Sequence, residues 1–373
     1  MNRKDHNNCI MILLIIFFVS LCFNSNTIVI AQATDVSKVI DELAVPESPA
    51  FAILGVTPES ITRPASPREL ALSFLQGLDP AGNFQSGLAI DTAPYLLFFG
   101  KGLTLEDYKK NIMKRELSRI QFSLATAKGI KEEDKAMRLS FGFRWVLWDE
   151  GDVRLDKTLI ECIDEAHKEA LEKFPSGKTL DPSEEEERMN RVAKYVEDQA
   201  IICRRECQKR NWNKSALDIG IAPSWISNDG TTNNVAWNGI GIWTSFSYGF
   251  NNFKSLKNKA QITFHTLYRT NESLADPSQT GMFFEQDSFS FGARLRYGNP
   301  KSSLLIQSIF IHAEPSSRAE DNSYRFSAGA EFQIATKLWL HLSVGGSGGR
   351  IDNNNQGFII SQLKWSFSEN KAI

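Results

Sequence analysis

After its N-terminal segment the sequence contains no long hydrophobic run, and this absence limits how the chain could cross a membrane. Beyond residue 33, no stretch approaches about eighteen consecutive apolar residues, the length that a membrane-spanning helix needs. Within a bilayer, only helices and closed barrels satisfy all their backbone hydrogen bonds internally. Any membrane-spanning part of residues 34–373 must therefore be built from strands.

The chain also lacks an excess of either charge. Its 42 Lys and Arg residues nearly balance its 44 Asp and Glu residues, which gives a formal net charge of −2. Proteins that bind nucleic acid usually carry a basic domain or a basic stripe. The composition therefore gives no electrostatic reason to expect a nucleic-acid partner.

Cysteine and histidine are scarce, with five residues of each. Two cysteines, Cys9 and Cys22, lie within the first 33 residues, so Cys162, Cys203 and Cys207 remain. In an oxidising compartment two of the three can form a disulfide, and the sequence does not decide which two. Cys203 and Cys207 lie one turn apart on a predicted helix, but no histidine or fourth thiol accompanies them. We therefore predict no metal site and no cofactor.

Residues 1–33 have the organisation of a secretory signal peptide. Arg3 and Lys4 precede an apolar segment at 10–22, and Ala31-Gln32-Ala33 provides a small-x-small cleavage site. The alternative interpretation is a membrane anchor that is retained, but the apolar segment is short for a spanning helix. We predict export and cleavage near Ala33.

About eleven segments between Leu88 and Phe367 share one pattern, in which apolar side chains alternate with small or polar ones over roughly ten residues. The run from Met137 to Leu147 shows it most clearly. Alternate side chains of a strand point to opposite faces, so each segment predicts a strand with one apolar and one polar face. Strands of soluble sandwiches usually have about five or six residues, whereas strands that cross a membrane need about 9 to 11. Residues 86–373 therefore predict an all-β membrane protein, an antiparallel transmembrane β-barrel.

The number of strands follows from the connections between them. The strands are predicted at 87–99, 117–126, 137–148, 215–226, 238–249, 259–269, 287–297, 303–313, 323–334, 337–346 and 357–367. Outer-membrane barrels have an even number of strands, short periplasmic turns and longer external loops. With a periplasmic C-terminus, this parity requires one strand before residue 87, for which Phe51–Thr57 is the candidate. The predicted barrel has about twelve strands, or ten if one early segment is a loop.

Two further segments are predicted around the first strands. Residues 34–85 form a pre-barrel segment, in which Ser66-Pro67-Arg68-Glu69 has the form of a capping box and predicts a helix that ends near Gly77. The apolar run that begins at Phe51 predicts either the first strand or a plug packed in the barrel mouth. Residues 103–118 predict a short amphipathic helix that lies along the membrane surface.

Residues 149–214 interrupt the strand pattern with two predicted helices. Apolar residues at helical spacing run from Leu159 to Phe174, and Asp181 begins a second helix whose stripe ends at Cys203. The two helices predict an antiparallel hairpin, which the strand parity places in the periplasm. Its charged residues indicate either a solvated surface or a docking site for a periplasmic protein. The docking candidates are Glu184, Glu185, Glu186, Glu187, Arg204 and Arg205.

The polar faces of the predicted strands would line the interior of the barrel. The candidate lumen residues are Arg138, Arg144, Asp218, His265, Arg269, Arg294, Arg296, Arg325, Glu331 and His341. Arginines outnumber carboxylates among them, and fixed positive charge in a pore favours anions. The same arginines could instead fill a narrow barrel and pair with carboxylates. Trp243 and Trp339 favour a narrow or occupied interior.

A barrel-embedded hydrolase is a third interpretation. His265 and His341 are predicted to face inward, and His312 lies near a strand end beside Glu314 without a recognisable nucleophile motif. A histidine held by a hydrogen bond in the lumen explains these positions more simply. We therefore predict no catalytic residues and no enzyme activity.

The signal peptide, the amphipathic strands and the aromatic end of the last strand, Trp365-Ser366-Phe367, together resemble Gram-negative outer-membrane β-barrel proteins as a class. The resemblance covers residues 87–367 in pattern only, and the chain continues past Phe367, where such barrels often end. It implies contact with outer-membrane lipid and insertion by the barrel assembly machinery. The leading hypothesis is a channel or facilitator for small solutes, with anions favoured by the arginines. The alternative is a membrane anchor that presents the helical insertion or the surface loops to a protein partner.

Overall fold

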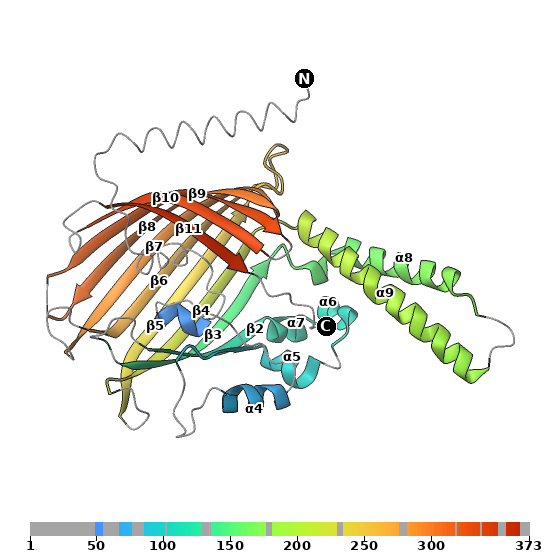
Figure 1. Cartoon of the computed structure of the whole chain (residues 1–373), viewed down its shortest axis with the longest axis horizontal. Helices are drawn as coiled ribbons and strands as arrows, with labels where there is room; N and C mark the ends of the chain where they lie inside the picture. The colour runs from blue at the N-terminus through green and yellow to red at the C-terminus, as the bar shows by residue number, and fades with distance from the viewer. Residues whose placement is uncertain are drawn as a thin grey trace.

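The computed structural model shows one large curved sheet with helices at one end of its strands (Figure 1). The predicted signal peptide, residues 1–33, lies outside the residues that the structure describes. The described residues are 49–54, 67–76, 86–100, 103–128, 134, 136–176, 181–229, 234–275, 282–317, 319–335, 338–349 and 356–365.

The described strands form a single antiparallel sheet in which each strand pairs with its neighbours in the chain. They are β1 (Ala89–Thr92), β2 (Ile120–Lys128), β3 (Met137–Asp149), β4 (Ala216–Ser227), β5 (Val235–Gly249), β6 (Ala260–Ala275), β7 (Phe283–Asn299), β8 (Ser302–Pro315), β9 (Asp321–Ala335), β10 (Leu338–Gly349) and β11 (Gln356–Trp365). Every alternating segment of the sequence contributes one strand, and β1 and β11 are the edges of the sheet in the described part of the chain.

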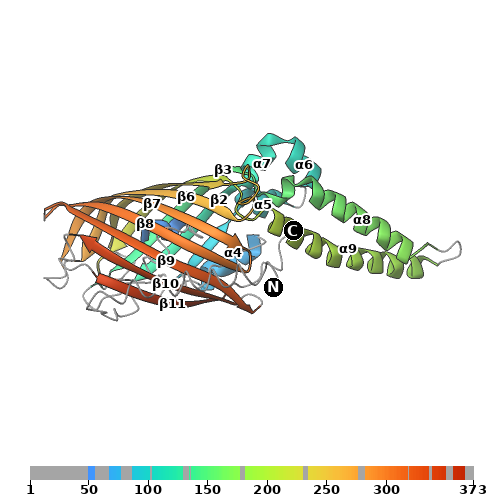
Figure 2. The same cartoon turned by 90° about the horizontal axis from the view of Figure 1, so that it is seen from above.

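The two faces of the sheet differ in side-chain chemistry, as the alternation predicts. Figure 2 shows that the sheet is curved, with a convex and a concave face. Large apolar side chains are exposed on the convex face, and small or polar side chains are buried on the concave face. Exposed examples are Phe141, Ile221, Ile242, Phe291, Phe326 and Leu342, and buried examples are Ser140, Ser224, Ser245, His265, Ser327 and His341. A soluble antiparallel sheet packs its apolar face on a core and turns its polar face to water, so this sheet has the opposite arrangement.

The helices lie beside the sheet or on its concave face. They are α3 (Pro49–Leu54), α4 (Pro67–Gln76), α5 (Pro94–Phe99), α6 (Leu105–Lys110), α7 (Ile112–Ser118), the 3-10 helix η2 (Val153–Leu155), α8 (Lys157–Lys173) and α9 (Pro182–Arg210). None of these described helices is both long enough and apolar enough to cross a membrane. Because neighbouring strands are antiparallel, the helices between β1 and β2 and those between β3 and β4 lie at the same end of the strands (Figure 2).

The predicted first strand at Phe51–Thr57 is wrong in its described part, because Pro49–Leu54 is helix α3. A short apolar run has no period that separates a strand from a buried helix. Helix α3 packs on the concave face of β2, β3, β4 and β5 (Figure 1), and a plug role for it stays a prediction. The described sheet therefore has eleven strands, and not about twelve.

The predicted strand 87–99 is too long. Strand β1 ends at Thr92, and α5 begins at Pro94. Proline has no N–H to donate to a strand partner, and its fixed φ suits the first turn of a helix. The chain therefore leaves the sheet at this proline.

The other predicted helices are found, with one change. Helix α4 confirms the helix predicted before Gly77. The helix predicted at 103–118 is broken into α6 and α7 by Asn111, whose Oδ1 accepts a hydrogen bond from the Lys114 N–H at 3.0 Å. An Asn at this position caps the second helix instead of continuing the first.

The helical hairpin predicted within residues 149–214 is confirmed. Helices α8 and α9 pack on each other and extend away from the sheet (Figures 1 and 2). At the start of α9, the Asp181 side chain accepts from the Glu184 N–H at 2.9 Å, and the Glu184 carboxylate accepts from the Asp181 N–H at 3.4 Å. This reciprocal capping box fixes where the second helix begins.

Candidate functional site

Helix α3 fits into a bed of small side chains on the concave face. Its residues Ala50, Phe51, Ile53 and Leu54 are all buried. The Ala50 N–H donates to Oγ of Ser123 on β2 at 2.7 Å. The apolar side chains of the sheet that pack against α3 are Ala89, Ala125, Ala127 and Ala222. Small side chains let the helix approach the sheet closely, so α3 occupies the inner face of β2 to β5.

Gly142 of β3 faces the start of α3 with no room for a side chain. A Cβ on Gly142 would lie 2.3 Å from the amide nitrogen of Ala50 and 2.6 Å from the carbonyl carbon of Pro49. On β5, a Cβ on Gly241 would lie 3.2 Å from Cβ of Ile53. A backbone that approaches another backbone this closely requires glycine. The glycines of the inner face, which the sequence pattern places on its polar side, are therefore part of the contact with α3.

The first two candidate lumen arginines are paired with carboxylates. Arg144 donates from Nε and Nη2 to Oδ1 of Asp218 at 3.0 and 2.7 Å. Arg138 lies 2.8 Å from Asp134 and also donates to the Ser273 carbonyl at 3.3 Å. Charge pairs with hydrogen bonds offset the cost of removing each ion from water. These two arginines therefore fit the interpretation in which arginines pair with carboxylates better than the one in which they are free charges that line a pore.

The remaining candidate arginines lie on β6, β7 and β9. Arg294 donates to Oε1 of Gln307 at 3.2 Å, and Arg269 lies 3.8 Å from Glu272. Arg325 of β9 also has an interaction partner.

Glu331 joins several strands on the same face. It lies 4.0 Å from Arg296 and 3.4 Å from His341, and it accepts from Oγ of Ser303 at 3.2 Å. The guanidinium of Arg296 also lies over the Trp212 ring at 5.4 Å. The sheet therefore brings these polar side chains together across four strands.

Among the described residues, no hydrogen bond joins a histidine to a serine or a cysteine. Ser245 and His265 are cross-strand partners, yet neither Oγ of Ser245 nor Nδ1 of His265 has a described hydrogen-bond partner. Nδ1 of His312 bonds to Oδ1 of Asn322 at 2.8 Å and Nε2 to Glu314 at 3.0 Å. A nucleophile must lie within hydrogen-bond reach of its base. The described residues also contain no group of His, Cys, Asp or Glu that could hold a metal ion.

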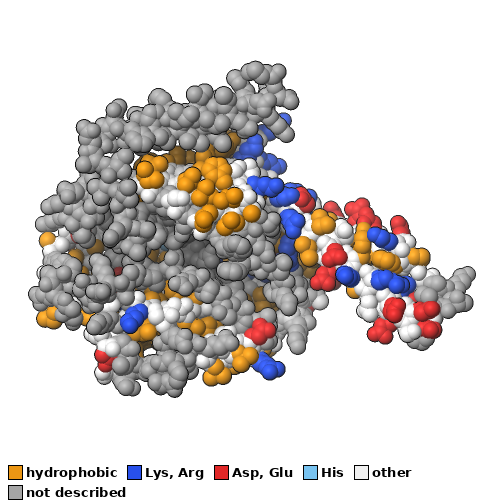
Figure 3. All heavy atoms as spheres, viewed as in Figure 1, with side chains coloured by type: hydrophobic (Ala, Val, Ile, Leu, Met, Phe, Trp, Pro, Cys, Tyr) orange, Lys and Arg blue, Asp and Glu red, His pale blue; other side chains and the backbone are white. Residues whose placement is uncertain are grey.

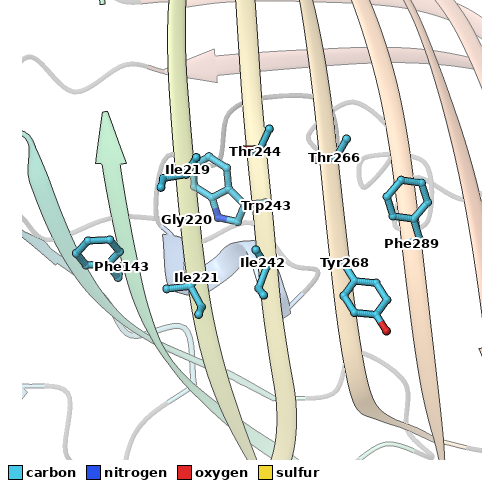
Figure 4. Close-up of a pocket in the computed structure, with 10 residues that line it drawn as sticks. All are labelled: Phe143, Ile219, Gly220, Ile221, Ile242, Trp243, Thr244, Thr266, Tyr268 and Phe289. Atoms are coloured by element: carbon cyan, nitrogen blue, oxygen red, sulfur yellow. The ribbon is translucent and has the colours of Figure 1, made fainter. Parts of the chain in front are cut away.

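A pocket in the described structure is lined by residues of β3 to β7 (Figure 4). Most of its lining side chains belong to the apolar face, and Trp243 lies against Gly220 (Figure 4). The lining residues are Phe143, Ile219, Gly220, Ile221, Ile242, Trp243, Thr244, Thr266, Tyr268 and Phe289. Without a carboxylate, a histidine or a lysine, such a surface suits apolar contact.

A disulfide between Cys162 and Cys203 connects α8 to α9. It closes a sequence separation of 41 residues, for which the chain-entropy model gives roughly 4 kcal/mol of stabilisation. Cys207 remains a buried free thiol that accepts from Nη2 of Arg210 at 3.0 Å. The structure thus selects one of the pairs that the sequence left open.

A buried polar cluster, which we call the base cluster, holds the root of the hairpin to α6 and α7. It consists of Tyr108, Arg119, Asp152 and Arg154. The Asp152 carboxylate accepts from the Tyr108 hydroxyl, from Arg119 Nη2 at 3.2 Å and from Arg154 Nε at 2.9 Å. The Arg154 guanidinium lies 4.2 Å from the centre of the Tyr108 ring. Sequence reasoning missed this cluster because its members lie on three separate elements and form no local motif.

The predicted docking residues lie toward opposite ends of α9, with acidic side chains at the end away from the sheet (Figure 3). Glu185 pairs with Arg188 at 2.5 Å, Glu184 takes part in the capping box, and Glu186 and Glu187 are exposed. The basic residues lie nearer the base, where Arg204 is half-buried and Arg205 is exposed. Exposed apolar residues of α8 and α9, which the sequence did not predict as docking residues, accompany them. They are Leu171, Met189, Ile201 and Ile202.

No known protein-family model matches this chain, and no curated protein matches it significantly. Its function is therefore inferred from the chemistry and the placement of the described side chains.

Proposed function

We propose that the sheet is the wall of a transmembrane β-barrel in an outer membrane. The barrel would close where β11, at one edge of the sheet, meets β1 and β2 at the other. Two observations support this. Strands β2 to β10 have between 9 and 17 residues, enough to cross a bilayer at a tilt. Their convex face is apolar and exposed, which lipid tolerates and water does not.

Within such a barrel, we propose a membrane anchor that holds the helical hairpin out toward a protein partner. The observation that carries this proposal is the build of the hairpin. Helix α9 has 29 residues, about 44 Å of helix at 1.5 Å per residue, and it extends from the edge of the sheet instead of packing on its faces (Figure 2). A disulfide and the base cluster fix it in place. The occupied inner face of β2 to β5 and the paired arginines support an anchor over an open pore.

The anchor proposal predicts that a protein partner contacts α9 and that the barrel folds without the hairpin. In the native host, a photo-crosslinking residue at Ile202, which is 49% exposed on α9, is expected to give one discrete protein adduct. The same residue at Phe291, on the apolar wall, is the control and is expected to give none. Replacing residues 157–210 by a short flexible linker should preserve heat-modifiable gel migration, because α8 and α9 contribute no strand to the sheet. Adducts at Ile202 no more frequent than at Phe291 would contradict the anchor.

A channel for small anions is the second candidate, and the placement of three arginines favours it. Helix α3 packs mainly on β2 to β5, whereas Arg269, Arg294 and Arg296 lie on β6 and β7. These three arginines outnumber the two carboxylates described beside them, Glu272 and Glu331, and an excess of positive charge along a path favours anions.

Conductance of the refolded protein in a planar bilayer tests the channel. If the path conducts, Arg294→Gln is expected to reduce its anion preference, measured as the reversal potential in a salt gradient. Arg191→Gln, at an exposed position of α9, is the matched control and should leave the preference unchanged. A folded and inserted wild-type protein that stays silent rules out the channel and agrees with the anchor.

A further inference from the structure

Helix α5 is built from apolar residues that the described protein does not cover. Its sequence is Pro-Tyr-Leu-Leu-Phe-Phe, and none of the six residues is buried. Phe98 is 59% exposed and Phe99 is 67% exposed. On the neighbouring helix α7, Ile112 and Met113 are 65% and 72% exposed. Large apolar side chains gathered in this way on a surface indicate an interaction site.

These helices, α5, α6 and α7, which we call the collar, lie next to the convex wall of the sheet. Helices α5 and α7 contact each other, and both contact β2. Oε2 of Glu116 on α7 accepts from the indole N–H of Trp145 at 3.2 Å. Trp145 belongs to the apolar face of β3, where the rings of Phe141 and Phe143 each lie 5.5 Å from the ring of Phe122 on β2. The apolar side chains of the collar therefore continue the apolar surface of the wall.

The collar is held in a defined place. Tyr108 of α6 is 1% exposed, and its hydroxyl donates to Asp152 beyond the end of β3. Arg119, directly after α7, also donates to Asp152. Buried hydrogen-bonded charge of this kind fixes orientation. The exposed apolar residues are thus presented by a fixed support.

The charges of the collar are largely neutralised within it. Lys110 lies 2.5 Å from Glu106, Lys114 lies 3.1 Å from Asp107, and Arg115 lies 3.4 Å from Glu116. A surface that recognises anionic lipid depends on unpaired basic residues. The collar therefore suits a bilayer through its apolar side chains more than through charge.

We propose that the collar is a lipid-binding surface. It lies on the membrane leaflet at the end of the barrel from which the hairpin extends, and it inserts Phe98, Phe99, Ile112 and Met113 among phospholipid chains. The proposal rests on the proposed membrane barrel. Amphipathic helices at a membrane surface bury their apolar side chains to a shallow depth and gain affinity from the area they bury. Phe and other large apolar side chains are typical of the membrane-facing side of such helices. The collar would fix the depth of the barrel and the direction in which the hairpin points.

The test is the environment of a nitroxide label in phosphatidylcholine vesicles, measured by its collisions with oxygen, which concentrates in lipid, and with a water-soluble nickel chelate. The full chain carries one label at a cysteine that replaces Met113, Phe291 on the wall, or Ile201 on α9. Background from the unsubstituted chain is subtracted, and gel migration checks that each variant folds. The oxygen-to-nickel ratio at Met113 is expected to be several-fold higher than at Ile201, an apolar control that is 50% exposed.

The Phe291 label separates the two ways in which the proposal could fail. A lipid-like ratio at Phe291 with a water-like ratio at Met113 would overturn the collar proposal and leave the barrel standing. A water-like ratio at Phe291 would overturn both. Adding anionic phosphatidylglycerol is expected to leave the Met113 ratio nearly unchanged. If Met113 contacts lipid only when the vesicles contain phosphatidylglycerol, the proposal that apolar side chains drive insertion is overturned.

Discussion

Replacing Gly142 with leucine is expected to displace helix α3 from the sheet and to turn a silent protein into a conducting one. Even a Cβ at this position would lie 2.3 Å from the Ala50 nitrogen, so the longer side chain of leucine cannot fit while α3 stays in place. Backbone atoms cannot move aside as a flexible side chain can. Conductance in a planar bilayer measures the change, with heat-modifiable gel migration as evidence that the barrel remains folded.

Two further variants make this prediction specific to α3. Gly357→Leu is the matched control, because an added Cβ there meets only the Gly345 carbonyl oxygen, at 3.9 Å. Phe51→Ala with Ile53→Ala weakens the plug from its own side and leaves the sheet unchanged. Removing a buried Phe or Ile side chain costs about 2 to 5 kcal/mol, so this variant should conduct in part. If Gly142→Leu is folded and silent, α3 does not block the barrel.

Replacing Asp152 with alanine is expected to free the hairpin and the collar from the barrel while the sheet stays intact. The Asp152 side chain is 3% exposed and accepts from Tyr108, Arg119 and Arg154. Removing one partner of a buried ion pair costs about 3 to 5 kcal/mol, because the other charge is left without compensation. Hydrogen exchange should rise over residues 103–119 and at the root of α8. Asp198→Ala, at an exposed position of α9, is the control and should change neither region. Unchanged exchange in Asp152→Ala would contradict a structural role for the base cluster.

The same cluster predicts a pH dependence. Burial alone would raise the pKa of Asp152. The hydrogen bonds from Arg154, the positive charge of Arg154 and the hydrogen bond from Tyr108 together hold this pKa below its ordinary value. A lowered carboxyl pKa stabilises the folded state above the unfolded pKa of about 3.9 and loses this effect as the pH falls further. Burial and the hydrogen bond to Asp152 raise the pKa of Tyr108 to about 12. That contribution is complete below the unfolded pKa of about 10 and is lost as the pH rises toward 12.

Hydrogen exchange across pH, corrected for the intrinsic rate, measures this window. The root of the hairpin is expected to be protected between about pH 4 and pH 10 and to loosen on either side. In Tyr108→Phe the loss at high pH should disappear, and the loss at low pH should remain. Loss at high pH that persists in Tyr108→Phe would show that another group causes it.

The sequence by itself determined those elements whose signals are local. Alternation from Met137 to Leu147 gives β3 and its two faces, because the side-chain period of a strand is set by its own backbone. The capping box at Asp181 gives the start of α9, because its hydrogen bonds join residues three apart. The same local reasoning placed all eleven strands, although it ran β1 past Pro94 and joined α6 to α7 across Asn111.

Only the tertiary structure decided how distant residues combine. Helix α3 (Pro49–Leu54) lies close against the concave face because Gly142 and Gly241 leave room for it there, and nothing within the run indicates those glycines. The pairing of Cys162 with Cys203 depends on how α8 packs on α9. Two of the arginines pair with carboxylates of other strands, Arg144 with Asp218 and Arg296 with Glu331. Each of these contacts depends on the register of the sheet and the packing of the helices, which a local pattern does not contain.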